Sequence, residues 1–466
     1  MKEYWIETEP VEFIAITRLD MNVEPGSHGR AVMEGYIEDE KEEEYLNLLQ
    51  SKTWMTIRAA NNKREREVLF WGLITEAYIT EENDQKKMSL ELKTGTFLMD
   101  VTVHKRTFQE KERTYGDIFH QLLGSYEKSG FFSTLPLSQP IGQLLVQYEE
   151  TDWEFLKRLA SMLGGVLAPN IRTKGVQFFA GLPKGEVRQI KEDGTYRIRR
   201  EIGKYWEKRK EGLLDAREEE FITYERKGRE SLSIGDSFVF QGRKCTIFSM
   251  KSHYHQGELL HTYYGDTKKE KREGRTYIEK IAGCSMKGVV KKVEGDQVQV
   301  EVKEDENKGG RRTIWFPYAT PYSTVDGTGW YCMPEEGDEV RLHFPTKREE
   351  DAYVISAVHL ETNSNDRSNP EHKILKTKHG KEIRFTPQSI IMTNNKGMKI
   401  QMTDGKGISI ESDGSINIGA KGDIRIQSAD SSIVIGADSS LTLAQGGTSI
   451  QLDKDIQFQG GQLRIQ

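Results

Sequence analysis

Cysteines are scarce in this sequence, and long hydrophobic stretches are absent. Only Cys245, Cys284 and Cys332 occur among 466 residues, widely separated, so neither a disulfide framework nor a Cys-x-x-Cys zinc ribbon is expected, and buried reduced thiols are predicted. No run of about eighteen apolar residues suggests a membrane-spanning helix. The start, Met1 to Glu7, lacks the basic and apolar regions of a secretory signal, so synthesis in the cytoplasm is expected.

Common catalytic and phosphate-binding motifs are also missing. The sequence has no Gly-x-Ser-x-Gly, Walker loop or His-Glu-x-x-His, and Gly309-Gly310-Arg311-Arg312 is interpreted as a flexible turn. His253-Tyr254-His255 is the only His-x-His; its imidazoles would share one side of a strand, but a solvated strand face is favoured over a metal site. The net charge of −6 argues against a polyanion or a membrane surface as partner. We therefore expect no enzyme activity, cofactor, metal or nucleic-acid partner.

The C-terminal region lacks Pro, Trp, Tyr and Cys between Gln388 and Gln466, and consists instead of a repeat. An apolar-polar-apolar triplet recurs about every eight residues, separated by Gly, Asp, Ser and Asn. Such alternation is typical of short strands with one dry and one wet face. The triplets are Ile383-Arg384-Phe385, Ile390-Ile391-Met392, Met398-Lys399-Ile400, Ile408-Ser409-Ile410, Ile416-Asn417-Ile418, Ile424-Arg425-Ile426, Ile433-Val434-Ile435, Leu441-Thr442-Leu443, Ile450-Gln451-Leu452, Ile456-Gln457-Phe458 and Leu463-Arg464-Ile465.

A repeat of this kind predicts a solenoid, because one unit cannot bury its own apolar face. A single-chain β-helix would need about 24 residues per coil, and no such longer period is present. We therefore favour a three-sided prism in which each of three chains supplies one strand per layer; an edge sheet or single-chain β-helix is the alternative. The residues predicted to form the trimer core are Ile400, Ile408, Ile410, Ile416, Ile418, Ile424, Ile426, Ile433, Ile435, Leu441, Leu443, Ile450 and Leu452.

The chain upstream of the repeat divides into four regions by its hydrophobic periods. Residues 1–105 and 196–280 show short alternating strands, whereas 106–195 contain two stretches with helical spacing, preceded by Thr114 and by the capping box Thr151-x-x-Glu154. An acidic run, Glu38 to Glu44, is predicted to be a solvated turn. Residues 281–362 contain as many predicted strands as a small barrel of the OB kind. Residues 363–375 are predicted to be a linker, and residues 376–466 contain the repeat.

Two motifs, together with the order of the regions, resemble the hub-and-spike proteins of contractile injection systems. Gln147 to Leu159 is similar to the "Y-x-E-S/T-D-x-x-F-x-x-R-L" helix of that family, and Gly329 to Val340 resembles the "P-E-x-G-D-E-V" strand-turn-strand of its OB domain. The family includes VgrG proteins of type VI secretion and spikes of phage tails and tail-like bacteriocins. The residues that match its motifs are Asp152, Phe155, Arg158, Pro334, Gly337 and Asp338.

The resemblance implies a mainly β protein with two hub β-barrels, an α/β insertion, an OB-fold collar and a trimeric intertwined β-helix as needle. Three copies would present six barrels to a sixfold tail tube, and the needle would puncture a membrane. Implied partners are two further copies, the tube, baseplate proteins, a PAAR-like tip protein and the target envelope, with delivery outside the cell. No His follows His379, so the iron-binding His-x-His found at some spike tips is absent.

Two other functions were weighed against this one. A cell-wall or polysaccharide hydrolase built on a β-helix platform is the first alternative, and an OB-type single-strand nucleic-acid binder is the second. The second needs a basic groove with stacking aromatics. Residues 281–362 carry 10 basic and 15 acidic side chains, a balance of 10 − 15 = −5, so Trp315, Phe316, Trp330 and Tyr331 are predicted to lie in the core or in trimer contacts.

Overall fold

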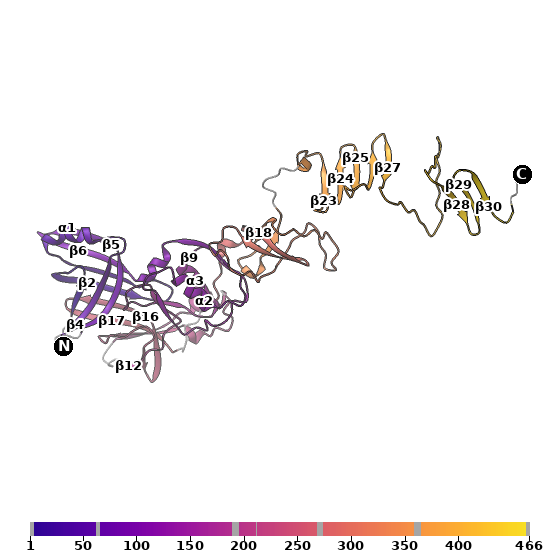
Figure 1. Cartoon of the computed structure of the whole chain (residues 1–466). Helices are drawn as coiled ribbons and strands as arrows, with labels where there is room; N and C mark the ends of the chain where they lie inside the picture. Colours follow the sequence, from indigo (N-terminus) through magenta and orange to yellow (C-terminus); the bar gives the residue numbers. More distant parts are fainter. Residues whose placement is uncertain are drawn as a thin grey trace. The chain divides into compact units, whose positions relative to one another are not determined.

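The structure is a computed structural model that describes residues 4–61, 66–188, 195–210, 212–267, 274–357 and 365–462. It divides into two units, Met1–His359 and Leu360–Gln466, and each is considered by itself (Figure 1). Within the described residues, no helix is both long and apolar enough to cross a membrane.

A twelve-stranded sheet forms most of the first unit, and it contains the strands of both predicted β regions. Its main path runs β1-β4-β5-β6-β3-β2-β16-β17-β14-β13, while β15 pairs with β16 and β12. The strands are β1 (Tyr4–Glu9), β2 (Ala15–Val23), β3 (Arg30–Tyr36), β4 (Trp54–Asn61), β5 (Arg66–Glu82), β6 (Gln85–Lys93), β12 (Val187–Arg188), β13 (Tyr196–Arg200), β14 (Ile222–Gly228), β15 (Ser237–Phe240), β16 (Arg243–His255) and β17 (Glu258–Asp266).

The two β regions are joined by antiparallel pairing of β2 with β16, where Val23 lies opposite Met250 and Leu19 opposite Tyr254. One apolar core cluster contains side chains from both regions, including Leu19 and Met250. The sequence predicted two barrel-like units, and the structure adds that they share a sheet and a core. The shared core fixes the two β regions to each other.

The acidic run was predicted to be a turn, and this is wrong. Asp39–Lys41 form a short 3-10 helix that leads into α1 (Glu42–Leu48). Tyr45 is buried in the core of the sheet, and its hydroxyl accepts a hydrogen bond of 3.1 Å from the backbone N–H of Glu12. Acidic side chains at a helix start interact favourably with the helix dipole, so one buried aromatic is enough to order this segment.

His261 on β17 is a buried imidazole whose Nδ1 lies 2.7 Å from the hydroxyl of Ser252. Burial lowers the pKa of His261 to about 4. The unfolded chain binds this proton near pH 6.5, so the contribution of His261 to stability is complete above that pH and is lost as the pH falls towards 4. Between pH 7 and 4.5 we expect a loss of about 2.5 kcal/mol from this group.

Urea unfolding of the wild type and His261→Gln at both pH values tests this expectation. His261→Gln should lack the loss of stability between pH 7 and 4.5 that is expected from His261. His253→Gln, which removes an exposed imidazole, should keep that loss. Equal pH dependence in all three proteins would show that His261 is not the group that titrates.

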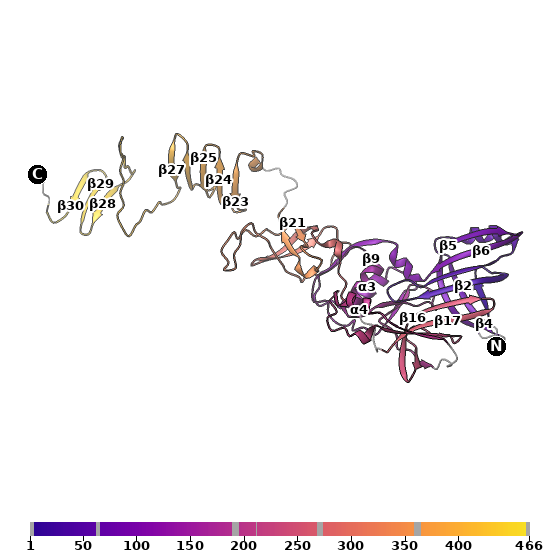
Figure 2. The same ribbon diagram turned by 180° about the vertical axis from the view of Figure 1, so that it is seen from behind.

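An α/β insertion follows β6, and both predicted helices are confirmed. Thr114 and Thr151 each form a capping box, with Asp117 and Glu154 respectively, and Gly164 adopts a φ of +72° just after the second helix. Figure 2 shows α3 beside β9 from behind, as Figure 1 does from the front. The elements are β7 (Val103–Phe108), α2 (Tyr115–Leu123), β8 (Gly130–Ser133), β9 (Leu145–Thr151), α3 (Asp152–Met162), β10 (Leu167–Pro169) and β11 (Gln177–Ala180), with α4 (Ile202–Lys210) further along the chain.

Residues 285–355 form a five-stranded sheet in the order β20-β19-β18-β21-β22, the predicted OB-type unit. Phe316 lies in its core, as predicted, whereas Trp330 and Tyr331 are exposed in the single chain. The strands are β18 (Ser285–Glu294), β19 (Gln297–Val302), β20 (Phe316–Pro317), β21 (Glu339–His343) and β22 (Tyr353–Ile355).

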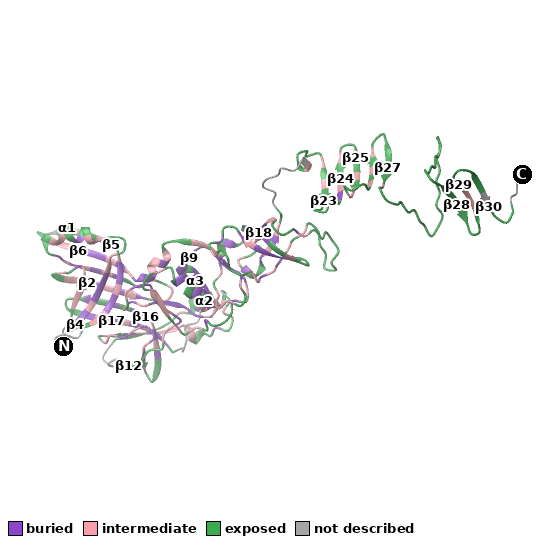
Figure 3. Ribbon diagram, in the orientation of Figure 1, coloured by how far each residue is buried: buried purple, intermediate pink, exposed green. Residues whose placement is uncertain are grey.

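The second unit consists of two antiparallel meanders, and Figure 3 shows its strands almost entirely as exposed or half-buried. Residues 412–440, all of which the structure describes, contain no strand, and the final triplet, Leu463-Arg464-Ile465, lies outside the described residues. The strands are β23 (Lys373–Lys376), β24 (Glu382–Thr386), β25 (Ser389–Thr393), β26 (Lys399–Thr403), β27 (Gly407–Glu411), β28 (Leu441–Gln445), β29 (Thr448–Leu452) and β30 (Ile456–Gln459).

The three cysteines are free thiols, but the prediction that all are buried is wrong. Cys245 is buried, Cys284 is half-buried and Cys332 is exposed. Burial raises the pKa of the Cys245 thiol to about 11. Cys245 therefore stays protonated and acts as a small apolar side chain in the core of the hub sheet.

Candidate assembly sites

Arg158 on α3 is the centre of a buried ion cluster between the insertion and the OB domain. Its guanidinium donates hydrogen bonds to Glu150 at 2.8 Å, to Glu349 at 2.9 Å and to the backbone carbonyl of Val146 at 2.6 Å. Glu150 precedes the same helix, whereas Glu349 belongs to the OB domain and also accepts a bond of 2.9 Å from the backbone N–H of Val146. The cluster thus ties three chain segments together.

Burial and charge act against each other in this cluster. Burial raises the pKa of the Glu349 carboxyl, and the adjacent Arg158 opposes that rise. Burial also disfavours the charged guanidinium of Arg158, but Glu349 and Glu150 outweigh this and raise its pKa. A guanidinium with two carboxylates and a carbonyl has its donors well satisfied, which is the condition for a buried charge to be tolerated.

Residues of β9 and its flank contribute to two cores. Leu145 packs in the cluster of the insertion, whereas its neighbours Leu144 and Val146 pack in the cluster of the OB domain. Successive residues of a strand point to opposite sides, so one strand can serve both. The two domains are therefore connected by apolar packing as well as by charge.

Asp152, the first residue of α3, is fully buried by a second polar network. Its Oδ1 accepts hydrogen bonds from Arg106 at 2.6 Å and from the Gln147 amide at 2.9 Å. Its Oδ2 accepts one from the Tyr126 hydroxyl at 2.7 Å. Phe155, one turn later, stacks on Phe108 with 5.4 Å between ring centroids. The motif residues Asp152, Phe155 and Arg158 thus hold α3 to β7, to β9 and to the OB domain.

The loop from Glu304 to Thr313 extends along β7 and adds to the junction. The backbone N–H of Glu306 donates to the carbonyl of Lys105 at 2.9 Å, and that of Thr313 donates to the carbonyl of Gln109 at 3.0 Å. Asp305 is buried, and its carboxylate accepts a bond of 3.0 Å from the backbone N–H of Thr107. These contacts bind one edge of the insertion to the OB domain.

Hydrogen bonds hold the second half of the Gly309–Arg312 turn, which the sequence analysis interpreted as flexible. The backbone N–H of Arg311 donates to Glu110 at 2.6 Å, and the Arg312 guanidinium donates to Glu301 at 2.6 Å. Arg311 and Arg312, the last two residues of the turn, are therefore anchored.

The other three motif residues lie in the OB domain, away from the Arg158 cluster. Pro334 is buried, and Gly337 has a φ of +95°, a conformation that favours glycine. The Asp338 carboxylate accepts a bond of 2.8 Å from the backbone N–H of Glu335, which closes the turn before β21. Pro334, Gly337 and Asp338 thus shape a turn rather than an interaction site.

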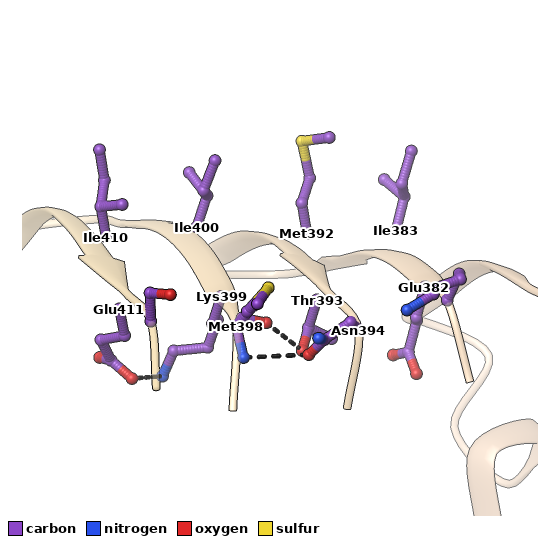
Figure 4. Close-up of a pocket in the computed structure, with 12 residues that line it drawn as sticks. Glu382, Ile383, Met392, Thr393, Asn394, Met398, Lys399, Ile400, Ile410 and Glu411 are labelled. Carbon is purple, nitrogen blue, oxygen red and sulfur yellow. Dashed lines mark hydrogen bonds and ion pairs between the residues drawn. The ribbon is translucent and has the colours of Figure 1, made fainter. Parts of the chain in front are cut away.

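In the first meander of the second unit, the triplet ends line one face of a sheet. Ile383 is paired with Met392, Met392 with Ile400, and Ile400 with Ile410 in successive strands. Directly paired residues project to the same side, and Figure 4 shows these four side chains in a row. Residues next to these apolar positions, such as Gln401 and Ser409, pair on the opposite face.

The apolar face of this meander is exposed in the single chain. Ile400 is 41% exposed, Ile410 58% and Ile408 72%. A shallow cavity of about 440 Å³ lies along it, lined by Ile383, Met392, Ile400 and Ile410 among others (Figure 4). Contiguous exposed apolar side chains of this kind often mark interaction sites. The face is therefore a candidate assembly site.

The remaining predicted core residues fall into two groups. Leu441 pairs with Leu452, and Leu443 pairs with Ile450, so the second meander repeats the arrangement of the first. Six others were predicted to lie in strands, but they are not in strands in the structure. The single chain provides no neighbouring strand with which they could pair. These six are Ile416, Ile418, Ile424, Ile426, Ile433 and Ile435, all exposed.

The His-x-His pair lies on a solvated strand face, as the sequence indicated. The rings of His253 and His255 are 6.0 Å apart on β16, and His253 Nδ1 lies 2.5 Å from Asp20. Among the described residues, no group of three or more His, Cys, Asp and Glu side chains is placed to hold a metal ion.

Two parts of the first unit match families of baseplate proteins. Residues 40–167 match the family described as phage tail baseplate hub (GPD), and residues 286–359 match the type VI secretion system/phage-baseplate injector OB domain. Residues 40–167 and 286–359 thus give the chain the hub and OB domains of VgrG-like hub-and-spike proteins, which are structural components of contractile injection systems. Among curated proteins, none matches this sequence.

Two solved structures have a fold similar to that of this chain. An Escherichia coli type VI secretion component, c3393, described as similar to the phage T4 tail proteins gp27 and gp5, matches with a TM-score of 0.53 and 13% identity, over 75% of this chain and 99% of its own. A half-lidded PdpA–VgrG complex of Francisella contains a chain that matches with a TM-score of 0.54 and 11% identity, over 88% of each chain. At these identities the similarity concerns the fold.

Proposed function

We propose that three copies of this chain assemble into a spike whose needle is a three-walled prism. Each wall would be the C-terminal part of one copy, with its apolar face turned towards a common axis. The observation that supports this most directly is the continuous row of triplet ends on one exposed face. Burying a row of aliphatic side chains is worth roughly 1.5–3 kcal/mol per residue, and threefold closure leaves no wall with a bare face.

The stretch from Ile416 to Ile435 fits the same proposal. Its triplets find no strand partner within the chain, although they continue the sequence pattern of the paired triplets on either side. In a trimer, neighbouring copies would supply both the missing backbone partners and the cover for the isoleucines. We therefore propose that this stretch is where the three chains intertwine, and that all thirteen predicted core residues line the axis.

The hub would match a threefold spike to a sixfold tube. Each copy contributes two β regions to one sheet, so a trimer would present six similar units in a ring. In this proposal residues 1–105 and 196–280 form the two units, 106–195 the insertion, 281–362 the collar, 363–375 the linker and 376–466 the needle. The tail tube would contact the ring, and baseplate proteins would surround it.

The work of the protein is mechanical in this account, with no bond chemistry required. When a sheath contracts, the needle would be driven through a cell envelope, with a PAAR-like protein at its tip. Synthesis in the cytoplasm and delivery within the assembled particle would bring the chain outside the producing cell. Neither a cofactor nor nucleic acid is needed at any step.

Electron microscopy of the native particle tests the proposed function. The chain should appear in three copies at the end of a tube inside a contractile sheath, with residues 376–466 projecting from it. A position along the tube wall, or three copies without a projecting needle, would contradict the proposal.

A further inference from the structure

One hairpin of the OB domain displays aromatic side chains to solvent. Residues 318–333, here called the aromatic hairpin, contain Tyr322, Trp330 and Tyr331, which are 53%, 57% and 72% exposed, and Val325, which is fully exposed at its tip. Within the described residues of this domain, these four are all of the large apolar side chains with high exposure. Aromatic residues of this kind are enriched where proteins meet.

The hairpin is an ordered structure rather than a loose loop. The backbone N–H of Trp330 donates to the carbonyl of Tyr322 at 2.9 Å, and that of Thr324 donates to Thr328 at 2.9 Å. Asp326 accepts a bond of 3.1 Å from the backbone N–H of Thr328, and Gly327 adopts a φ of +84° at the turn. The backbone therefore holds the exposed side chains in a defined arrangement, which lowers the entropy lost on binding.

Charge distinguishes this hairpin from the rest of its domain. From Phe316 to Pro334 the sequence has one charged residue, Asp326, in a chain that is 30% charged overall. The domain as a whole carries the net charge of −5 noted above, so most of its surface would repel a second copy. The hairpin is therefore the part of the OB domain through which two copies can contact each other without placing like charges side by side.

We propose that the aromatic hairpin packs against the same hairpin of neighbouring copies, so that it fastens the collar of the trimer. This inference rests on the proposed three-copy assembly. It adds a contact between OB domains to the contact that the needle makes between copies. The proposed occupant is the OB domain of another copy, because the hairpin is the part of this acidic domain that combines exposed apolar side chains with little charge. Hairpins that meet around a threefold axis can each supply both sides of the contact.

Site-specific photocrosslinking in the full chain tests this contact. The variant Val325→p-benzoylphenylalanine places the probe at the exposed tip, and Gln297→p-benzoylphenylalanine places it at an exposed position of the same domain outside the hairpin. We expect covalent multimers of this chain from the first variant and none from the second. The joined peptides should both come from residues 318–333.

Light scattering on the same samples separates failure of the inference from failure of the proposed function. A three-chain mass with no crosslink from position 325, or with crosslinks to the hub or the needle, would overturn the hairpin contact and leave the trimer intact. A single-chain mass would overturn both.

A second pair of variants guards against an incidental crosslink. Trp330→Ser should abolish the crosslink from position 325, whereas Tyr78→Ser, which removes an exposed aromatic of the hub sheet, should retain it. A crosslink that survives Trp330→Ser unchanged would show that the aromatic surface does not make the contact.

Discussion

Ile400→Asp is expected to lower the stability of the trimeric needle by roughly 10 kcal/mol per trimer, because it places three carboxyl groups in one apolar layer. Ile400 lies in the middle of the exposed apolar row, paired with Met392 on one side and Ile410 on the other. Each ionised carboxylate buried there costs several kcal/mol. The thermal transition of the full-length assembly, followed by circular dichroism, should move to a clearly lower temperature.

Gln401→Asp is the matched control for that substitution. It introduces the same charge one residue later, where the side chain projects to the opposite face and pairs with Ser409. We expect a change of less than about 1 kcal/mol per chain there. Equal melting of Ile400→Asp and the parent, or equal damage from both variants, would contradict the proposed apolar axis.

The pH dependence gives an additional check on Ile400→Asp. A carboxyl group in an apolar layer has a pKa raised above its unfolded value of about 3.9, so it destabilises the assembly least below pH 4 and more as the pH rises. The difference between this variant and the parent should therefore grow from pH 4 to pH 8. A difference that stays constant would point to steric damage instead of burial of charge.

Arg158→Met is expected to destabilise the first unit by about 3–5 kcal/mol, since it leaves the carboxylates of Glu150 and Glu349 without their buried cation. Glu349 is almost fully buried, so water cannot replace the lost partner. Urea unfolding followed by tryptophan fluorescence measures the loss, and limited proteolysis should release the OB domain more readily.

Two further variants make the Arg158 experiment specific. Lys157→Met removes the same charge from the neighbouring, half-buried position of α3 and should cost less than about 1 kcal/mol. Adding Glu349→Gln to Arg158→Met should recover part of the stability, because an amide is less costly to bury than an unpaired carboxylate. If Arg158→Met and Lys157→Met prove equally mild, the buried cluster does not hold the OB domain to the hub.

Local signals in the sequence predicted a large part of this structure. The Thr151-x-x-Glu154 box and the glycines after Met162 marked α3 at both ends, since capping depends only on neighbouring residues. The alternation of the triplets predicted which side chains share a face, and Ile400 and Ile410 lie as it required. Such features depend on residues close together in the chain, so one sequence contains them.

Contacts between distant segments could not be predicted. Arg158 on an apolar helix face signals a buried acidic partner, but Glu349 lies 191 residues away and looks like any other acid of a highly charged chain. The pairing of β2 with β16 is similarly remote. The acidic residues 38–44 were misjudged because one buried contact, Tyr45, outweighs their preference for solvent.

The solution mass of the full chain, measured by light scattering, tests the central claim most directly. With a chain mass of 53.4 kDa, three copies should appear as a single species of three times that value, with residues 376–466 resistant to protease. A well-folded species of one chain mass, whose C-terminal region is equally protected, would show that the repeat covers its apolar face without other copies. That result would contradict the trimeric needle.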